Sequence, residues 1–135
     1  EQATDLIDWA YSSEHSHGKI AIPKIKALKV TDIANVLIKS YGLDIPLKYI
    51  GIRRGEKLHE EMITESDSHN TIELGRYYAI LPSDVKKEKF LKHFNAKEVP
   101  PGFSYSSRDN QEWVDEETLQ ELIRQHVDPD FEPLR

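Results

Sequence analysis

Apolar residues recur at helical spacing in the first part of the chain. They stand at positions i, i+3, i+4, i+7 and i+8 of the opening segment, which are Ala3, Leu6, Ile7, Ala10 and Tyr11. This spacing predicts an amphipathic helix, followed by a polar run at residues 12–18. A second helix is predicted from a cap at Thr31 or Asp32 to a stop at Gly42.

Two further helices are predicted in the second half of the chain. The first is rich in lysine and runs from a cap at Ser83 to about Phe94. The second is capped by Asp115 and ends at Pro129, with the apolar stripe Leu119, Leu122, Ile123 and Val127.

Short apolar runs with strand character lie on both sides of the second helix. Residues 19–22 form the first run and end at Pro23, and residues 46–52 form the second run. A strand, a helix and a strand at this spacing predict a βαβ unit with parallel pairing and a right-handed crossover.

The middle of the chain predicts a short helical stretch and a hairpin. The helical stretch covers residues 57–63, and a polar loop follows at residues 64–70. Residues 71–74 and 77–81 are two β-type runs joined by Gly75-Arg76, which is typical of a hairpin. Residues 103–113 follow a proline-rich break and are expected to be irregular.

Composition narrows the class of protein. The chain has 135 residues, a net charge of -6 and no cysteine. The negative charge argues against a nucleic-acid-binding protein, and no apolar run approaches the ~20 residues that cross a bilayer. We therefore expect no nucleic-acid partner, no membrane partner and a cytoplasmic location. Because the chain opens at Glu1 inside a helical pattern, we also expect it to be part of a longer protein.

The segment with the most specific chemistry is residues 51–63. It places Arg53, Arg54 and Glu56 around Gly55, directly after the predicted strand. Guanidinium groups match phosphate oxygens, and a carboxylate can accept hydrogen bonds from ribose hydroxyls. The segment therefore predicts a nucleoside diphosphate site. On these four residues alone, an ordinary turn is favoured, in which Arg53 or Arg54 pairs with Glu56 and binds nothing.

The order of motifs along the chain resembles one enzyme family. The matching segments are residues 22–25, 29–34, 51–63, 71–74, 77–82 and 103–107, with Asn110 and Trp113. Together they resemble the end of the capsular-polysaccharide type of UDP-N-acetylglucosamine 4,6-dehydratase/5-epimerase, an extended short-chain dehydrogenase. The resemblance implies an α/β fold that corresponds to the C-terminal, substrate-binding portion, without the Rossmann half that binds the coenzyme.

The resemblance also implies roles for the residues of the turn. Arg53 is expected to contact the diphosphate of a UDP-sugar substrate, and Glu56 the uridine ribose. The family usually has proline at the position of Arg54, which is either a second phosphate contact or a solvent-exposed side chain. The family uses NADP to remove a hydride from the sugar, eliminates water, and returns the hydride with inversion.

Two motifs that this chemistry needs are not found in the sequence. There is no glycine-rich phosphate-binding turn, and no tyrosine is followed four residues later by lysine. We therefore expect this chain alone to be inactive, to contain no catalytic residue and to bind no NADP. The coenzyme would be held by an N-terminal coenzyme domain of the longer protein.

Three regions are expected along the chain. Residues 1–82 form the α/β substrate-binding region, residues 83–102 a variable helix and linker, and residues 103–135 an aromatic segment and helix. The last region contains Tyr105, Asn110 and Trp113, and large aromatics in an irregular segment favour a contact between subunits of a homo-oligomer.

One functional alternative remains open at this point, and two possible metal motifs are not favoured. The chain is also compatible with a stand-alone, non-catalytic module for nucleotide-sugar binding or assembly. His15 and His17 are spaced so that they can bind a metal, but a solvated turn is favoured because no further ligands stand nearby in sequence. His59 begins a motif like that of zinc proteases, but Ile63 occupies the second ligand position.

Overall fold

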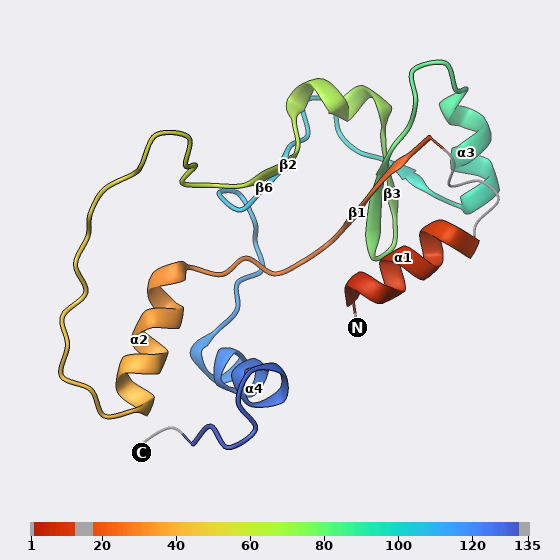
Figure 1. Ribbon diagram of the computed structural model, residues 1–135. Coiled ribbons are helices and arrows are strands. Elements are labelled where there is room, and N and C mark those ends of the chain that lie inside the picture. Colours follow the sequence, from red (N-terminus) through yellow and green to blue (C-terminus); the bar gives the residue numbers. More distant parts are fainter. Residues whose placement is uncertain (1, 13–17, 133–135) are drawn as a thin grey trace. The chain divides into compact units, whose positions relative to one another are not determined.

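The computed structural model describes residues 2–12 and 18–132, and these residues form two compact units (Figure 1). The sheet unit comprises Glu1–Ile25 and Glu60–Ser106, and the helix unit comprises Lys26–His59 and Ser107–Arg135. Each unit is thus assembled from two separate stretches of the chain. The unit boundaries differ from the sequence-based divisions at residues 82 and 102.

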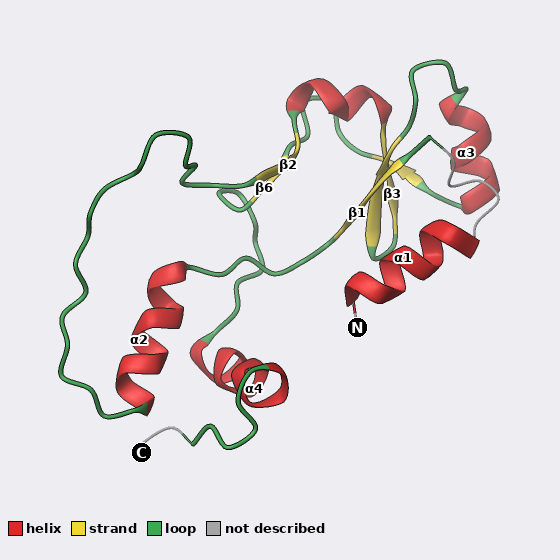
Figure 2. Ribbon diagram, viewed as in Figure 1, coloured by secondary structure: helices red, strands yellow, loops and turns green. Residues whose placement is uncertain are grey.

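A four-stranded antiparallel sheet forms the centre of the sheet unit (Figure 2). The predicted hairpin is confirmed, because β3 and β4 pair in the register Ile72↔Ala79. Gly75 turns between these strands with a φ of 58°, a conformation that glycine adopts without a steric penalty. In spatial order the strands are β1 (Ile20–Pro23), β4 (Tyr77–Ile80), β3 (Thr71–Leu74) and β5 (Lys97–Glu98).

Two of the described α-helices contact this sheet. Helix α3 (Lys87–Phe94) contributes Phe90 and Leu91 to the core around the buried Ile72. It begins after Lys86 rather than at Ser83, so the predicted helix exists but its cap is wrong. Helix α1 (Gln2–Ser12) stacks Trp9 on Tyr77 with ring centroids 5.5 Å apart. Trp9 lies off the apolar stripe of α1, and its ring makes this contact within the chain.

Residues 57–70 differ from the sequence-based expectation. The predicted helical stretch at 57–63 is wrong: its end forms β2 (Glu61–Ile63), which pairs with β6 (Tyr105–Ser106). The predicted polar loop forms the 3-10 helix η1 (Glu65–Asn70) instead. Ile63 is fully buried, so tertiary pairing with a distant segment overrides the local helical preference.

Helices α2 (Val30–Ser40) and α4 (Glu116–His126) pack together in the helix unit. Their shared core consists of the buried residues Val36, Leu119, Ile123 and Phe131. The predicted cap of α4 is confirmed, because the Asp115 carboxylate accepts a hydrogen bond from the Thr118 N–H at 2.7 Å. The predicted cap of α2 is wrong: Lys29 occupies the cap position without a side-chain hydrogen bond.

The predicted βαβ unit is not formed. Strand β1 pairs only with β4, in antiparallel orientation, and residues 44–52 form neither helix nor strand. The described residues contain one parallel bridge, between Ala27 and Trp113. The fold is a small mixed α/β arrangement. The predicted α/β class is therefore confirmed, although the predicted parallel unit is not. None of its described helices is both long and apolar enough for a membrane span.

Candidate functional site

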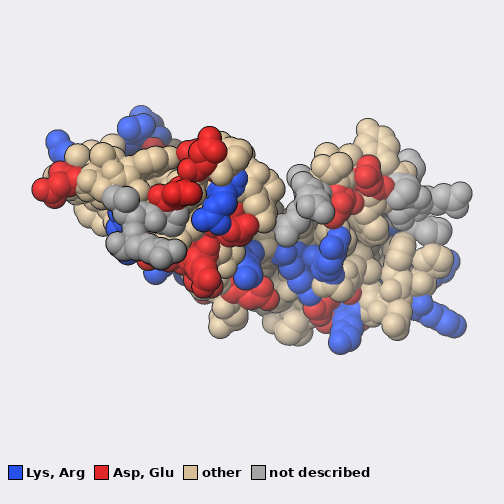
Figure 3. Space-filling model, turned by 90° about the horizontal axis from the view of Figure 1, so that it is seen from below, with Lys and Arg blue, Asp and Glu red and all other residues tan. Residues whose placement is uncertain are grey.

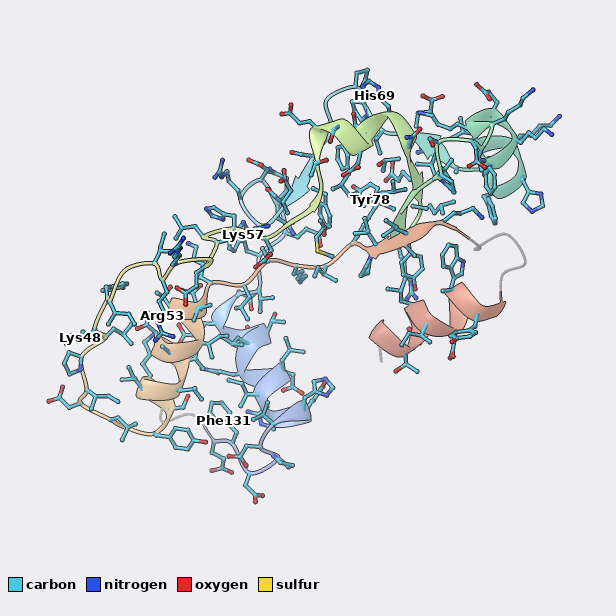
Figure 4. The ribbon with its side chains drawn as sticks, turned by 45° about the horizontal axis from the view of Figure 1, so that its top comes forward. Lys48, Arg53, Lys57, His69, Tyr78 and Phe131 are labelled. Carbon is cyan, nitrogen blue, oxygen red and sulfur yellow. The ribbon has the colours of Figure 1, made fainter. Side chains whose placement is uncertain are left out.

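Arg53 and Glu56 are brought together by a tight turn in the helix unit. The Arg53 N–H donates to Glu56 Oε2 at 2.8 Å, and the Glu56 N–H donates to the Arg53 carbonyl at 3.0 Å. Gly55 has a φ of 91°, which a residue with a Cβ rarely adopts. The two hydrogen bonds and the glycine fix the backbone, so the turn has a defined shape within a segment that forms neither helix nor strand (Figure 4).

The two side chains of the turn interact only weakly with each other. Arg53 Nε lies 3.9 Å from Glu56 Oε1, and their side chains are 73% and 51% exposed. An ion pair at this distance in water contributes less than about 1 kcal/mol. The Arg53 guanidinium and the Glu56 Oε1 atom are therefore accessible to a ligand at little energetic cost.

Arg54 adds a second exposed cation next to Arg53. Within residues 2–12 and 18–132, no ion pair with Arg54 is present. The structure thus joins Arg53 and Glu56 as the sequence predicts and leaves Arg54 available. Nucleotide binding by these three residues remains a prediction.

The segment after the turn, at His59, makes a contact that the sequence does not reveal. His59 Nδ1 lies 3.4 Å from Ser107 Oγ, and both side chains are half-buried. These residues are 48 positions apart in the chain, so no local spacing could have found the pair. The contact links the end of the Arg53–Glu56 segment to the residue that follows β6.

A second polar cluster lies on the sheet unit. Lys24 pairs with Glu73 across the sheet, and its Nζ lies 4.7 Å from the centre of the Tyr78 ring. Burial raises the pKa of the Tyr78 hydroxyl. A cavity of about 50 Å³ opens beside Lys24 and Arg76. Ligand pockets commonly span ~300–1,000 Å³, so this cavity is too small for a nucleotide sugar.

Metal ligands and surface charge were the other possible signs of a site in the described part of the chain. The described residues hold no cluster of three or more potential metal ligands. His15 and His17 lie outside the described residues. His59 lies in a bend before β2 and not on a helix, whereas the zinc-protease arrangement needs a helix. On the face shown in Figure 3, basic and acidic side chains are interspersed, unlike the basic footprint of nucleic-acid-binding proteins.

More than half of the chain matches a known protein family. Residues 1–82 match the family described as "Polysaccharide biosynthesis protein". This match covers more than half of the 135 residues. The chain belongs to this family. The family assignment includes the Arg53–Glu56 turn, and it agrees with the resemblance inferred from the order of motifs.

Curated relatives of the family match the chain over most of its length. A UDP-N-acetylglucosamine 4,6-dehydratase (inverting) of Campylobacter jejuni subsp. jejuni serotype O:2 is 44% identical over 117 residues. The match covers 82% of this chain and 34% of the relative. A UDP-glucose 4-epimerase of Rickettsia felis is 30% identical over 124 residues, covering 90% of this chain and 35% of the relative. The chain therefore spans about a third of the length of these relatives.

A solved structure extends the similarity to three dimensions. The X-ray structure of Pen from Bacillus thuringiensis superposes with a TM-score of 0.71 at 28% sequence identity. The superposition covers 92% of this chain and 36% of that chain. The described fold thus recurs as a portion of a larger protein, in keeping with the share of the curated relatives that the sequence matches.

Proposed function

We propose that this chain is the UDP-N-acetylglucosamine-binding part of a 4,6-dehydratase/5-epimerase that makes precursors of bacterial surface polysaccharides. The observation that supports this most strongly is the preformed Arg53–Glu56 turn, with its exposed guanidinium and carboxylate. It stands in a chain of the polysaccharide biosynthesis family that is 44% identical over 117 residues to a UDP-N-acetylglucosamine 4,6-dehydratase.

The chemistry of the turn suits the two halves of a nucleoside diphosphate, the charged diphosphate and the neutral ribose. The Arg53 guanidinium offers a planar set of N–H donors to the diphosphate oxygens. Glu56 Oε2 accepts the Arg53 N–H and holds the turn, while Oε1 is available to accept a hydrogen bond from a ribose hydroxyl. Arg54 supplies a second cation for the same phosphates. The segment therefore binds the nucleotide and leaves the sugar to be transformed elsewhere.

The rest of the reaction is assigned to a longer protein. NADP would be held by a coenzyme domain outside these 135 residues, since the chain has neither a glycine-rich phosphate turn nor a Tyr-x-x-x-Lys pair. This chain contributes substrate binding and contains no catalytic residue. We place the longer protein in the cytoplasm as a homo-oligomer whose subunits meet through the segment after residue 103.

Calorimetric titration of the chain with UDP and with uridine tests the proposal. UDP should bind, and Arg53→Ala should weaken that binding by roughly 10-fold to 100-fold, because charge-assisted hydrogen bonds contribute about 1.5–3 kcal/mol each. Uridine should be insensitive to the same change, because it carries no phosphate. Arg108→Ala removes an exposed arginine outside the turn and serves as the matched control.

Two results would contradict the proposal. If UDP affinity falls equally in Arg53→Ala and Arg108→Ala, the effect reflects net charge rather than a site. If UDP does not bind either to this chain or to a longer protein that contains it, the turn is purely structural.

A further inference from the structure

Helix α3 in the sheet unit presents a stripe of lysines to solvent. Residues 86–97 contain five lysines and one glutamate. Lys87 forms an ion pair within the sheet unit, whereas Lys86, Lys89 and Lys92 are exposed and form no ion pair among the described residues. Residues three apart lie next to each other on a helix. These three lysines therefore form one surface, the basic face of α3.

The apolar side of α3 is already occupied. Phe90 and Leu91 pack against the core around Ile72. Lys19 Nζ lies 4.3 Å from the centre of the Phe90 ring and 5.6 Å from that of Phe94. Helix α3, all of which is described, thus exposes no large apolar side chain. A helix that binds a membrane surface needs such side chains, so the basic face fits an acidic protein surface better.

Helix α4 in the helix unit carries the opposite charge on its outer side. Residues 109–132 contain nine acidic residues and one arginine. Glu117 and Glu121 are exposed, one helical turn apart, on the side of α4 opposite to the core. Glu121 pairs with Arg124 of the same helix at 2.6 Å, and Glu117 has no ion pair among the described residues. A surface hollow of about 510 Å³ lies beside these two glutamates, which form the acidic face of α4.

We propose that the basic face of α3 in one copy of the chain docks onto the acidic face of α4 in a second copy. Opposite charges on two different faces of one chain favour a head-to-tail contact, in which each copy offers one face to its neighbour. The hollow beside the glutamates gives long lysine side chains room to reach the carboxylates. This step rests on the homo-oligomer of the proposed function, in which the segment after residue 103 is one contact surface. It names α3 as the surface that meets that segment.

Salt should control this contact. Both faces are exposed, and ion pairs between exposed side chains are individually weak and are screened by dissolved ions. We therefore expect the association to weaken by about 10-fold or more when the salt concentration rises from about 0.05 M to about 0.5 M. An interface held by apolar contacts would not weaken in this way. Sedimentation velocity measures the association at both salt concentrations.

Charge reversal tests whether the two faces meet between copies. Lys89→Glu/Lys92→Glu makes both faces acidic, and Glu117→Lys/Glu121→Lys makes both faces basic. Each variant alone should sediment as a monomer, because faces of like charge repel each other. An equal mixture of the two variants should associate again, because each variant supplies the face that the other lacks.

The control is Lys48→Glu/Lys57→Glu, which replaces two exposed lysines outside both faces and changes the net charge equally. Its assembly should match that of the parent chain. A parent chain that stays monomeric at low salt, or reversed variants that assemble as the parent does, would overturn the contact. A mixture that stays monomeric would also overturn it. Binding of the parent chain to phosphatidylserine vesicles that is lost in Lys89→Glu/Lys92→Glu would assign the basic face to a membrane instead.

Calorimetry with UDP on the same variants separates the contact from the nucleotide site. The reversed residues lie outside the Arg53–Glu56 turn, so UDP should bind the monomeric variants as it binds the parent chain. Association without UDP binding would remove the nucleotide site and keep the interface. UDP binding without association would keep the nucleotide site and remove the interface. Thermal unfolding confirms that the variants remain folded.

Discussion

The hydroxyl group of Tyr105 forms two hydrogen bonds with the backbone of Ile25. It accepts one from the Ile25 N–H at 2.8 Å and donates one to the Ile25 carbonyl at 2.9 Å. One side chain thus makes both of the bonds that a neighbouring strand would make. Its ring also lies 5.3 Å from that of Tyr78. These contacts within the chain give Tyr105 a structural role, beside the oligomer contact that remains a prediction for its segment.

Replacing Tyr105 with phenylalanine should remove both bonds while keeping the ring. Ile25 is 44% exposed, so water replaces part of what is lost, and we expect the free energy of unfolding to fall by about 1 kcal/mol. Urea denaturation measures this. Tyr11 is 89% exposed, and Tyr11→Phe should leave the midpoint unchanged. Equal midpoints for Tyr105→Phe and the parent chain would show that the bridge contributes nothing.

Phe131 should be the most sensitive apolar position of the helix unit. Its side chain is 1% exposed, packs in the core with Leu119 and Ile123, and meets the Tyr41 ring at 5.9 Å. Phe131→Ala should lower the free energy of unfolding by about 3–5 kcal/mol, because it leaves a cavity. Val127 is 77% exposed, so Val127→Ala should change it by less than about 0.5 kcal/mol. Similar losses in both variants would contradict the assigned core.

The elements that the sequence predicts well are those whose signals are local. The α4 cap at Asp115 and the β3–β4 hairpin at Gly75 depend on residues within a few positions of each other. The pairing of β2 with β6 depends on residues more than 40 positions apart, so local spacing at residues 57–63 favoured a helix. The run at 46–52 has the composition of a strand. A strand also needs a pairing partner elsewhere in the chain, and the composition of the run does not show whether one is present.

The candidate site shows the same division between local and distant information. The i, i+3 spacing of Arg53 and Glu56 made their meeting in a turn predictable. The contact of His59 with Ser107 joins residues from the two separate stretches of the helix unit. This contact could not be predicted because no local sequence pattern near His59 or Ser107 indicates the other residue.

Acid should weaken the cap of α4. The Asp115 carboxylate accepts the Thr118 N–H, and this hydrogen bonding lowers the pKa of Asp115 below its usual value of 3.8. A carboxyl group whose pKa is lower in the folded state stabilises above its unfolded pKa. This stabilisation is lost as the pH falls through the folded value. Asp115→Asn keeps an uncharged cap, so its melting temperature should fall less than that of the parent between pH 5 and pH 2. Identical acid profiles would contradict the role of Asp115.

NADP should not bind to this chain by itself. The prediction follows from the motifs that are not found in the sequence, and Trp9 and Trp113 provide a fluorescence signal to test it. Titration with NADP should give only a linear, unsaturable change. Saturation in the micromolar range would mean that these residues form a coenzyme site without the fingerprint of a Rossmann fold.

The most specific prediction concerns how much Arg53, Arg54 and Glu56 each contribute to the affinity for UDP. Arg53→Ala should weaken UDP binding by roughly 10-fold to 100-fold, at 1.4 kcal/mol per decade. Glu56→Gln should cost less than Glu56→Ala, because an amide oxygen can still accept the Arg53 N–H that closes the turn at 2.8 Å. In a longer, active protein the KM for the UDP-sugar should rise more than kcat falls, because these groups contact a part of the substrate that does not react.

Arg54→Ala is the matched control for the register of the site, since the two arginines are adjacent and equally charged. If UDP affinity survives Arg53→Ala and collapses in Arg54→Ala, then Arg54 is the phosphate contact and our assignment is shifted by one residue. If it survives both changes, the hydrogen bonds between Arg53 and Glu56 serve only to shape the turn. If Glu56→Gln and Glu56→Ala weaken binding equally, the carboxylate charge matters more than the hydrogen bond to Arg53. Glu56 would then bind the nucleotide directly and contribute little through the turn.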